Sequence, residues 1–137
     1  MRCNLYANEE LIGWAELIPT DPPMGRAGGP FYPNENYGKI QPIIREYNLY
    51  DGTLGEVNGI KRAEAQAKID ALRLSVITED GEVLDPAGGA NIADFSQELD
   101  EDPYQLDVIG LPFDIYDHLF PLAWQEYFTQ SEGKEQD

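Results

Sequence analysis

The densest group of potential ligands in the sequence is an acidic cluster made of Glu98, Asp100, Glu101 and Asp102. Carboxylate oxygens are the ligands that Ca²⁺ prefers, and a calcium-binding loop supplies about six to eight of them around a central glycine. Counted from Asp100, the sixth position lacks that glycine and the twelfth lacks the usual glutamate. The cluster therefore predicts a solvated acidic turn, which is a candidate binding surface, and no metal site is expected.

The chain has one cysteine, Cys3, and one histidine, His118, so it cannot assemble a zinc site of cysteines and histidines. A nucleophilic pair of the two is possible in principle, because such partners need only meet in space. Neither residue has a catalytic signature beside it, so we expect a buried thiol and a surface histidine, and we assign no catalytic residue. The glycine pairs at 28–29 and 88–89 match no nucleotide-binding motif, and no cofactor is expected.

The least generic stretch runs from Pro19 to Gly38 and holds five of the ten prolines and four of the thirteen glycines. Because proline fixes φ and glycine permits positive φ, this stretch is expected to be irregular but rigid. Such loops form binding surfaces or merely cover one end of a sheet, and the sequence favours neither reading. The candidate binding residues here are Asp21, Pro22, Pro23, Met24, Phe31 and Tyr32.

The same stretch carries Asp-Pro-Pro-Met-Gly at 21–25 and Gly-Pro-Phe at 29–31. In this it resembles a group of short, acidic, uncharacterised bacterial proteins, and the resemblance extends to residues 92–96 and 110–112. The resemblance implies a stand-alone bacterial domain. The resemblance implies no particular activity, so it says nothing about the mechanism.

An aromatic stripe of Trp124, Tyr127 and Phe128 lies on the last predicted helix, at helical spacing. The stripe can pack onto the domain's own sheet. It can instead dock onto a second copy of the chain and form a symmetric homodimer. The sequence leaves both possibilities open.

The elements that must position these residues follow from hydrophobic periodicity. Strands are predicted at 2–7, 11–18, 72–78, 82–84, 92–95 and 106–111. Helices are predicted at 36–48, 60–71 and 114–120, with a last helix from 121. This order predicts a single α+β domain over residues 1–128, with a largely antiparallel sheet of about five or six strands and two or three helices. Residues 129–137 contain no apolar side chain and predict a disordered acidic tail.

The charge is distributed unevenly along the chain. The net charge is −17, and residues 71–137 contribute −14 of it, from two basic and sixteen acidic residues. Such a field repels nucleic acid and anionic lipid, so neither nucleic-acid binding nor membrane binding is expected. The N-terminus lacks the apolar core of a signal peptide, and a cytoplasmic protein is the simplest interpretation.

These observations favour a non-enzymatic interaction protein whose acidic C-terminal half docks a basic protein partner, as immunity proteins and DNA mimics do. One alternative is a self-associating structural or regulatory domain. Another is a small carboxylate-based or metal-assisted hydrolase, because a catalytic pair among twenty-six acids cannot be recognised from sequence. The acidic-docking hypothesis requires the carboxylates of residues 79–117 to share one surface.

Overall fold

A computed structural model describes the backbone of residues 1–135 and the side chains of residues 1–130. Over this part the chain forms eight strands and four α-helices, with two short 3-10 helices. The strands are β1 (Arg2–Ala7), β2 (Glu10–Glu16), β3 (Ile18–Asp21), β4 (Arg26–Pro33), β5 (Ser75–Thr78), β6 (Val83–Leu84), β7 (Ala90–Asp94) and β8 (Tyr104–Val108). The helices are η1 (Pro22–Met24), η2 (Glu35–Lys39), α1 (Gln41–Tyr50), α2 (Gly59–Ala71), α3 (Phe113–Leu119) and α4 (Ala123–Glu135). The α+β class is confirmed, but the chain has more strands than predicted.

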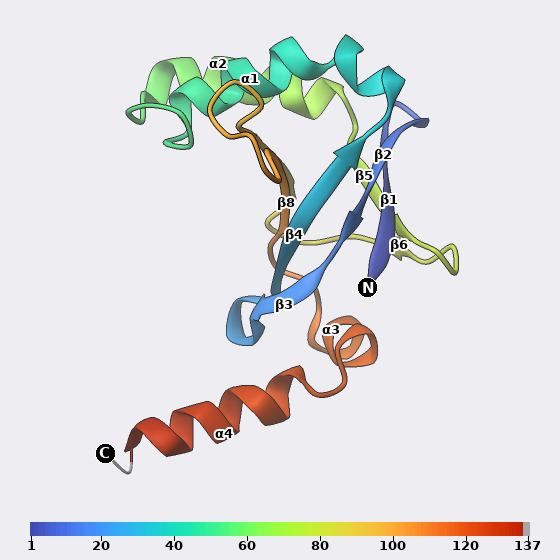
Figure 1. Cartoon of the computed structure of the whole chain (residues 1–137), viewed down its shortest axis with the longest axis vertical. Helices are drawn as coiled ribbons and strands as arrows, with labels where there is room; N and C mark the ends of the chain where they lie inside the picture. Colours follow the sequence, from blue (N-terminus) through green and yellow to red (C-terminus); the bar gives the residue numbers. More distant parts are fainter. Residues whose placement is uncertain (136–137) are drawn as a thin grey trace.

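The strands form one curled antiparallel sheet in the order β6-β5-β1-β2-β4-β8-β7, and β3 also pairs with β4 (Figure 1). Strands β2 and β3 follow each other closely along the same edge of β4. Residues 13–15 of β2 pair with residues 31–33 of β4, and β3 pairs with residues 26–28. The opposite edge of β4 pairs with β8 over residues 27–30. Strand β4 therefore lies in the middle of the sheet.

The position of β4 corrects the expectation that residues 19–38 are irregular. Glycine and proline have low β propensity, so the composition of this stretch predicted a loop. In the structure Gly29 lies so close to β2 that an added Cβ would overlap the carbonyl oxygen of Glu16. The glycine is thus required by a close approach of two strands, and pairing on both edges outweighs the local propensity.

Helices α1 and α2 lie together across one end of the curled sheet, and α3 lies at the other end (Figure 1). Helix α1 is held against β7, and its first turn contains Pro42, where the missing N–H has no cost. The buried core runs between these ends. Its largest fully buried apolar side chains include Leu5, Ile12, Phe31, Ile44 and Tyr116.

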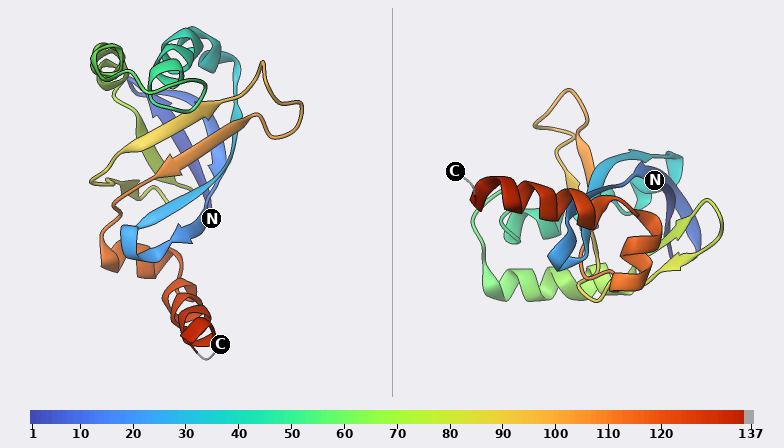
Figure 2. Two further views of the ribbon diagram at one scale, coloured as in Figure 1. Left: turned by 90° about the vertical axis from the view of Figure 1, so that its left-hand side faces the viewer. Right: turned by 90° about the horizontal axis from the view of Figure 1, so that it is seen from below.

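Helix α4 projects away from the body of the molecule (Figure 2). Its backbone is helical to Glu135, over most of the segment 129–137 for which the sequence predicts a disordered acidic tail. Glutamine, glutamate and lysine are good helix formers, so a helix there needs no apolar residue. The part of that prediction that concerns Gln136 and Asp137 lies outside the described residues.

Candidate functional site

The Pro/Gly loop around η1 and the first turns of α4 meet at the end of the molecule that carries α3. Two backbone hydrogen bonds tie the loop to the segment before α3, from the amide of Gly110 to the carbonyl of Met24 (3.0 Å) and from that of Leu111 to Gly25 (3.1 Å). The Tyr116 hydroxyl adds a hydrogen bond of 2.9 Å to the carbonyl of Arg26. These bonds join segments more than eighty residues apart into one firm platform.

Aromatic rings gather on this platform around Trp124. Its ring centroid lies 5.5 Å from that of Phe113, 5.8 Å from that of Tyr127 and 5.6 Å from that of Phe128. Such separations are typical of favourable ring pairs. The indole N–H of Trp124 is buried without a hydrogen-bond partner. The three aromatic rings of the stripe therefore lie together, and Trp124 also lies beside Phe113 of α3 and lines the hollow next to η1.

Much of this end is apolar and exposed to solvent. The relative exposure is 57% for Met24, 65% for Phe113, 61% for Leu122 and 56% for Phe128, and Tyr127 is also exposed. We call Met24, Phe113, Tyr127 and Phe128, which lie around Trp124, the C-terminal apolar surface. A hollow of about 390 Å³ opens between η1, α3 and Trp124. Exposed apolar groups gathered in this way usually mark an interaction site.

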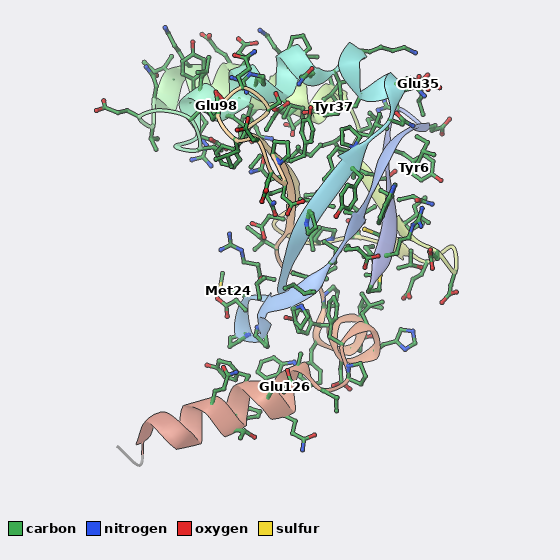
Figure 3. The ribbon with its side chains drawn as sticks, in the orientation of Figure 1. Tyr6, Met24, Glu35, Tyr37, Glu98 and Glu126 are labelled. Atoms are coloured by element: carbon green, nitrogen blue, oxygen red, sulfur yellow. The ribbon has the colours of Figure 1, made fainter. Side chains whose placement is uncertain are left out.

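Carboxylates flank the C-terminal apolar surface. Asp21 precedes η1, Asp114 follows Phe113, and Glu126 precedes Tyr127. Figure 3 shows Met24 and Glu126 at this end of the molecule. Within the described side chains, η1, α3 and α4 contribute no lysine or arginine. The surface is therefore apolar at its centre and negative at its margin.

The sequence-predicted binding residues of the Pro/Gly loop separate into two groups. Pro22, Pro23 and Met24 lie beside the aromatic stripe, with Asp21 directly before them in sequence, so two candidate regions that are distant in sequence form one surface. Phe31 and Tyr32 do not join them. Phe31 is 2% exposed and belongs to the core, and Tyr32 stacks on Trp14 with ring centroids 4.4 Å apart.

The acidic cluster lies at the opposite end, in the loop between β7 and β8 (Figure 3). The carboxylate of Glu98 accepts hydrogen bonds of 2.9 and 3.0 Å from the two terminal nitrogens of Arg45. These bonds lower the pKa of Glu98. Asp100, Glu101 and Asp102 are exposed. Across the described residues, no three His, Cys, Asp or Glu side chains form a group that could hold a metal ion.

Most of the carboxylates of residues 79–117 lie in two regions. Those of the β5–β6 hairpin and of α3 are neighbours, because His118 of α3 lies 3.9 Å from Glu82, and those of the β7–β8 loop lie apart from them. The hairpin and the loop project in different directions (Figure 2). Several of these acids are paired with arginines, as Asp107 is with Arg26 at 2.8 Å. The acids of residues 79–117 therefore do not form one face, and the requirement of the acidic-docking hypothesis is not met in that form.

Sequence reasoning missed a buried polar network centred on Asp94, which has no exposed surface. Its Oδ2 accepts hydrogen bonds from the Tyr37 hydroxyl (2.6 Å) and from Gln41 Nε2 (3.0 Å), and its Oδ1 accepts one from the Ser96 amide (2.9 Å). Burial acts to raise the pKa of Asp94, but these hydrogen bonds outweigh it and the pKa is lowered. Burial and the bond to Asp94 raise the pKa of Tyr37. With both oxygens occupied, the carboxylate is suited to holding η2 and α1 on β7 rather than to acid–base chemistry.

Cys3 and His118 lie in different environments. The thiol of Cys3 is fully buried in β1, and burial raises its pKa to about 11. His118 is on α3, with 72% of its side chain exposed, and its Nε2 lies 3.9 Å from Glu82. A thiol with a raised pKa is a poor nucleophile, so this environment does not activate Cys3.

Comparison with known proteins found no matching family model, no matching curated protein and no matching solved structure. None of the described helices combines the length and the apolarity needed to cross a bilayer.

Proposed function

We propose that the protein is a non-enzymatic interaction protein that docks a basic protein partner on its C-terminal apolar surface. The observation that carries this proposal is the meeting of η1, α3 and α4 at one end, where exposed aromatic and aliphatic side chains have the acids Asp21, Asp114 and Glu126 beside them. The proposal keeps the basic partner expected from the sequence. It moves the docking site from the dispersed acids to this surface.

The composition of the surface supports docking of a protein. Interface centres are enriched in aromatic residues and methionine, and the residues that contribute most binding energy are often tryptophan and tyrosine. Met24, Trp124, Tyr127 and Phe128 supply these types side by side.

The charge at the margin supports a basic partner. Asp21, Asp114 and Glu126 would meet lysine or arginine side chains around the apolar centre. Opposite charges at a rim speed association and disfavour the wrong partners. The strongly negative charge of the whole chain acts in the same direction.

Self-association is the second candidate, and the exposure of Leu122 and Phe128 on or beside α4 favours it. A symmetric dimer would bring the acidic margin of one copy against that of the other, which costs free energy at low salt. Sedimentation velocity at low and high salt separates the two candidates. A dimer that is stable at low salt would favour self-association, whereas a monomer leaves the surface free for a basic partner.

A peptide titration tests the proposed chemistry. The probe is a helical lysine–leucine peptide with all its leucines on one face, and the control is an isomer of the same composition without such a face. We expect the amphipathic peptide to bind and the double variant Tyr127→Ser/Phe128→Ser to weaken binding at least about tenfold. Ile60→Ser, which removes an apolar side chain that is 78% exposed on α2, should leave binding unchanged.

A pair of charge reversals tests the role of the margin. Glu126→Lys and Glu101→Lys change the net charge equally, but only Glu126 flanks the C-terminal apolar surface. We expect Glu126→Lys to weaken peptide binding clearly more than Glu101→Lys does. Equal effects would mean that peptide binding depends only on the net charge of the protein, and they would count against this docking site.

A further inference from the structure

A second hollow, unrelated to the C-terminal apolar surface, lies between the C-terminal end of α2 and the Gly-Gly loop that joins β6 to β7. Its volume is about 300 Å³. The polar side chains that line it include Gln66, Asp70, Arg73 and Asn91, and Tyr47 contributes an aromatic wall. From this arrangement we infer that the hollow binds a small zwitterion of the α-amino-acid class, with its carboxylate on Arg73 and its ammonium on Asp70.

Arg73 is exposed and has no partner among the described residues, in a chain with a large excess of acid. Six other lysine and arginine side chains of this part contact a carboxylate or an aromatic ring, and Tyr47 raises the pKa of Arg62. In that part of the structure Arg73 makes no ion pair and no side-chain hydrogen bond, although it lines the hollow beside Asp70. Its guanidinium is therefore available for the bidentate hydrogen bonds that a carboxylate accepts.

Arg73 is also one of four non-glycine residues with a positive φ in the described part of the chain. Its φ is +47°, just after the C-cap residue Leu72 of α2, where glycine is the usual residue. A residue with a Cβ loses stability in this left-handed conformation, and such strain is often found at functional sites. An arginine at a position suited to glycine is consistent with a role for its side chain.

The other half of the hollow is suited to a cation. One oxygen of Asp70 accepts a hydrogen bond of 2.9 Å from Gln66, which orients the carboxylate and leaves its second oxygen free of that bond. The C-terminal end of a helix carries partial negative charge and favours a positive group. Asp70 and Arg73 form no ion pair with each other, so a ligand with both charges can bind between them.

The charge of the whole protein narrows the ligand class further. A net charge of −17 repels a small anion before it reaches Arg73, whereas a zwitterion carries no net charge. The side chain of such a ligand would rest on Tyr47 and Ile69, which supply the apolar part of the wall. A Cβ added at Gly89 would meet no atom within 4 Å, so the loop leaves open space at this edge of the hollow.

The test is a calorimetric and thermal-shift titration of the full chain with the twenty free L-amino acids, each used alone. We expect at least one of them to bind with a millimolar or lower Kd. For that amino acid, the N-acetyl derivative and the amide derivative should each bind at least about tenfold more weakly, because each lacks one charge. A panel without any binder, or a derivative that binds as well as the free amino acid, would overturn the inference.

Two variants distinguish the loss of the binding site from a loss of folding. Arg73→Gly should weaken binding at least about tenfold and yet melt at a higher temperature than the wild type, since glycine relieves the left-handed strain. Lys61→Ala removes the same charge at the other end of α2 and should leave binding unchanged. Binding that survives Arg73→Gly, or a melting temperature of that variant below that of the wild type, would contradict the argument. Neither result would bear on peptide binding at the C-terminal apolar surface.

Discussion

The hydroxyl of Tyr37 donates a hydrogen bond of 2.6 Å to Asp94, and this bond joins η2 to β7 across fifty-seven residues of sequence. Both side chains are buried, so water cannot replace either partner. A hydrogen bond to a buried charge contributes more to stability than one between neutral groups. The pair therefore anchors the helical end of the molecule to the sheet.

Removing one partner should destabilise the fold without changing its shape. We expect Tyr37→Phe to lower the free energy of unfolding by about 2 kcal/mol, because it deletes a hydrogen bond to a buried carboxylate. Tyr104→Phe is the matched control. Tyr104 packs against Tyr37 with ring centroids 5.5 Å apart, and its hydroxyl makes no hydrogen bond in the described part of the chain. Urea denaturation measures the free energy of unfolding of both variants. An equal loss of stability in the two would contradict the role of the Tyr37–Asp94 bond.

The same network gives a pH dependence. The pKa of Asp94 is lowered in the folded state, so the carboxylate stabilises the fold above its unfolded pKa of about 3.9. That stabilisation should be lost as the pH falls below about 4 and through the lowered folded pKa. In Asp94→Asn this component should be missing, so the acid side of its stability profile should be flatter than that of the wild type. Parallel profiles would show that Asp94 does not contribute in this way.

Because β2 and β4 approach each other closely at Gly29, one methyl group added there is expected to lower the stability of the fold strongly. Gly29→Ala places a Cβ against the carbonyl oxygen of Glu16, so the strands must move apart, and we expect a loss of about 2–3 kcal/mol. Gly59→Ala is the control, because a Cβ at this helical position meets nothing within 4 Å. It should stabilise the protein slightly, by up to about 1 kcal/mol. Thermal melts of the two variants distinguish these outcomes, and a well-folded Gly29→Ala protein of normal stability would refute the packing argument.

The burial of Cys3 predicts an unreactive thiol. Its side chain is fully buried, and its pKa is raised to about 11, so little thiolate exists at neutral pH. A thiol reagent such as Ellman's reagent should react at neutral pH only as fast as the protein unfolds. Denaturant should restore the rate of a free thiol. Rapid labelling of the native protein would mean that β1 opens without global unfolding.

Local patterns in the sequence were sufficient for α2 and the β5–β6 hairpin. They were not sufficient for every helix, because the helix predicted at 36–48 is η2 followed by α1, and α4 extends into the segment predicted to be disordered. Helix α2 follows its run of good helix formers, and β5 and β6 flank the turn at Glu79-Asp80-Gly81 as predicted. Strand β4 could not be predicted, because its two glycines and two prolines have low β propensity and its stability comes from pairing on two edges. The network of Asp94 was equally hidden, since its partners lie far away along the chain.

The candidate site was partly visible in the sequence. The Pro/Gly loop and the aromatic stripe were each predicted as candidate surfaces, but nothing local indicates that Met24 and Trp124 line the same hollow. The burial of Phe31 likewise depends on its place in the central strand. The dispersal of the acidic half is a consequence of topology, because the β5–β6 hairpin and the β7–β8 loop lie in different parts of the fold.

The most direct test of the docking proposal is a comparison of three immobilised baits in one native lysate. The baits are the wild type, Tyr127→Ser/Phe128→Ser and Ile60→Ser, each washed at low and then at high salt. We predict that a basic protein is retained at low salt by the wild type and by Ile60→Ser but not by the double variant. The same basic proteins on all three baits, or none on any of them, would contradict the claim that the C-terminal apolar surface is the docking site.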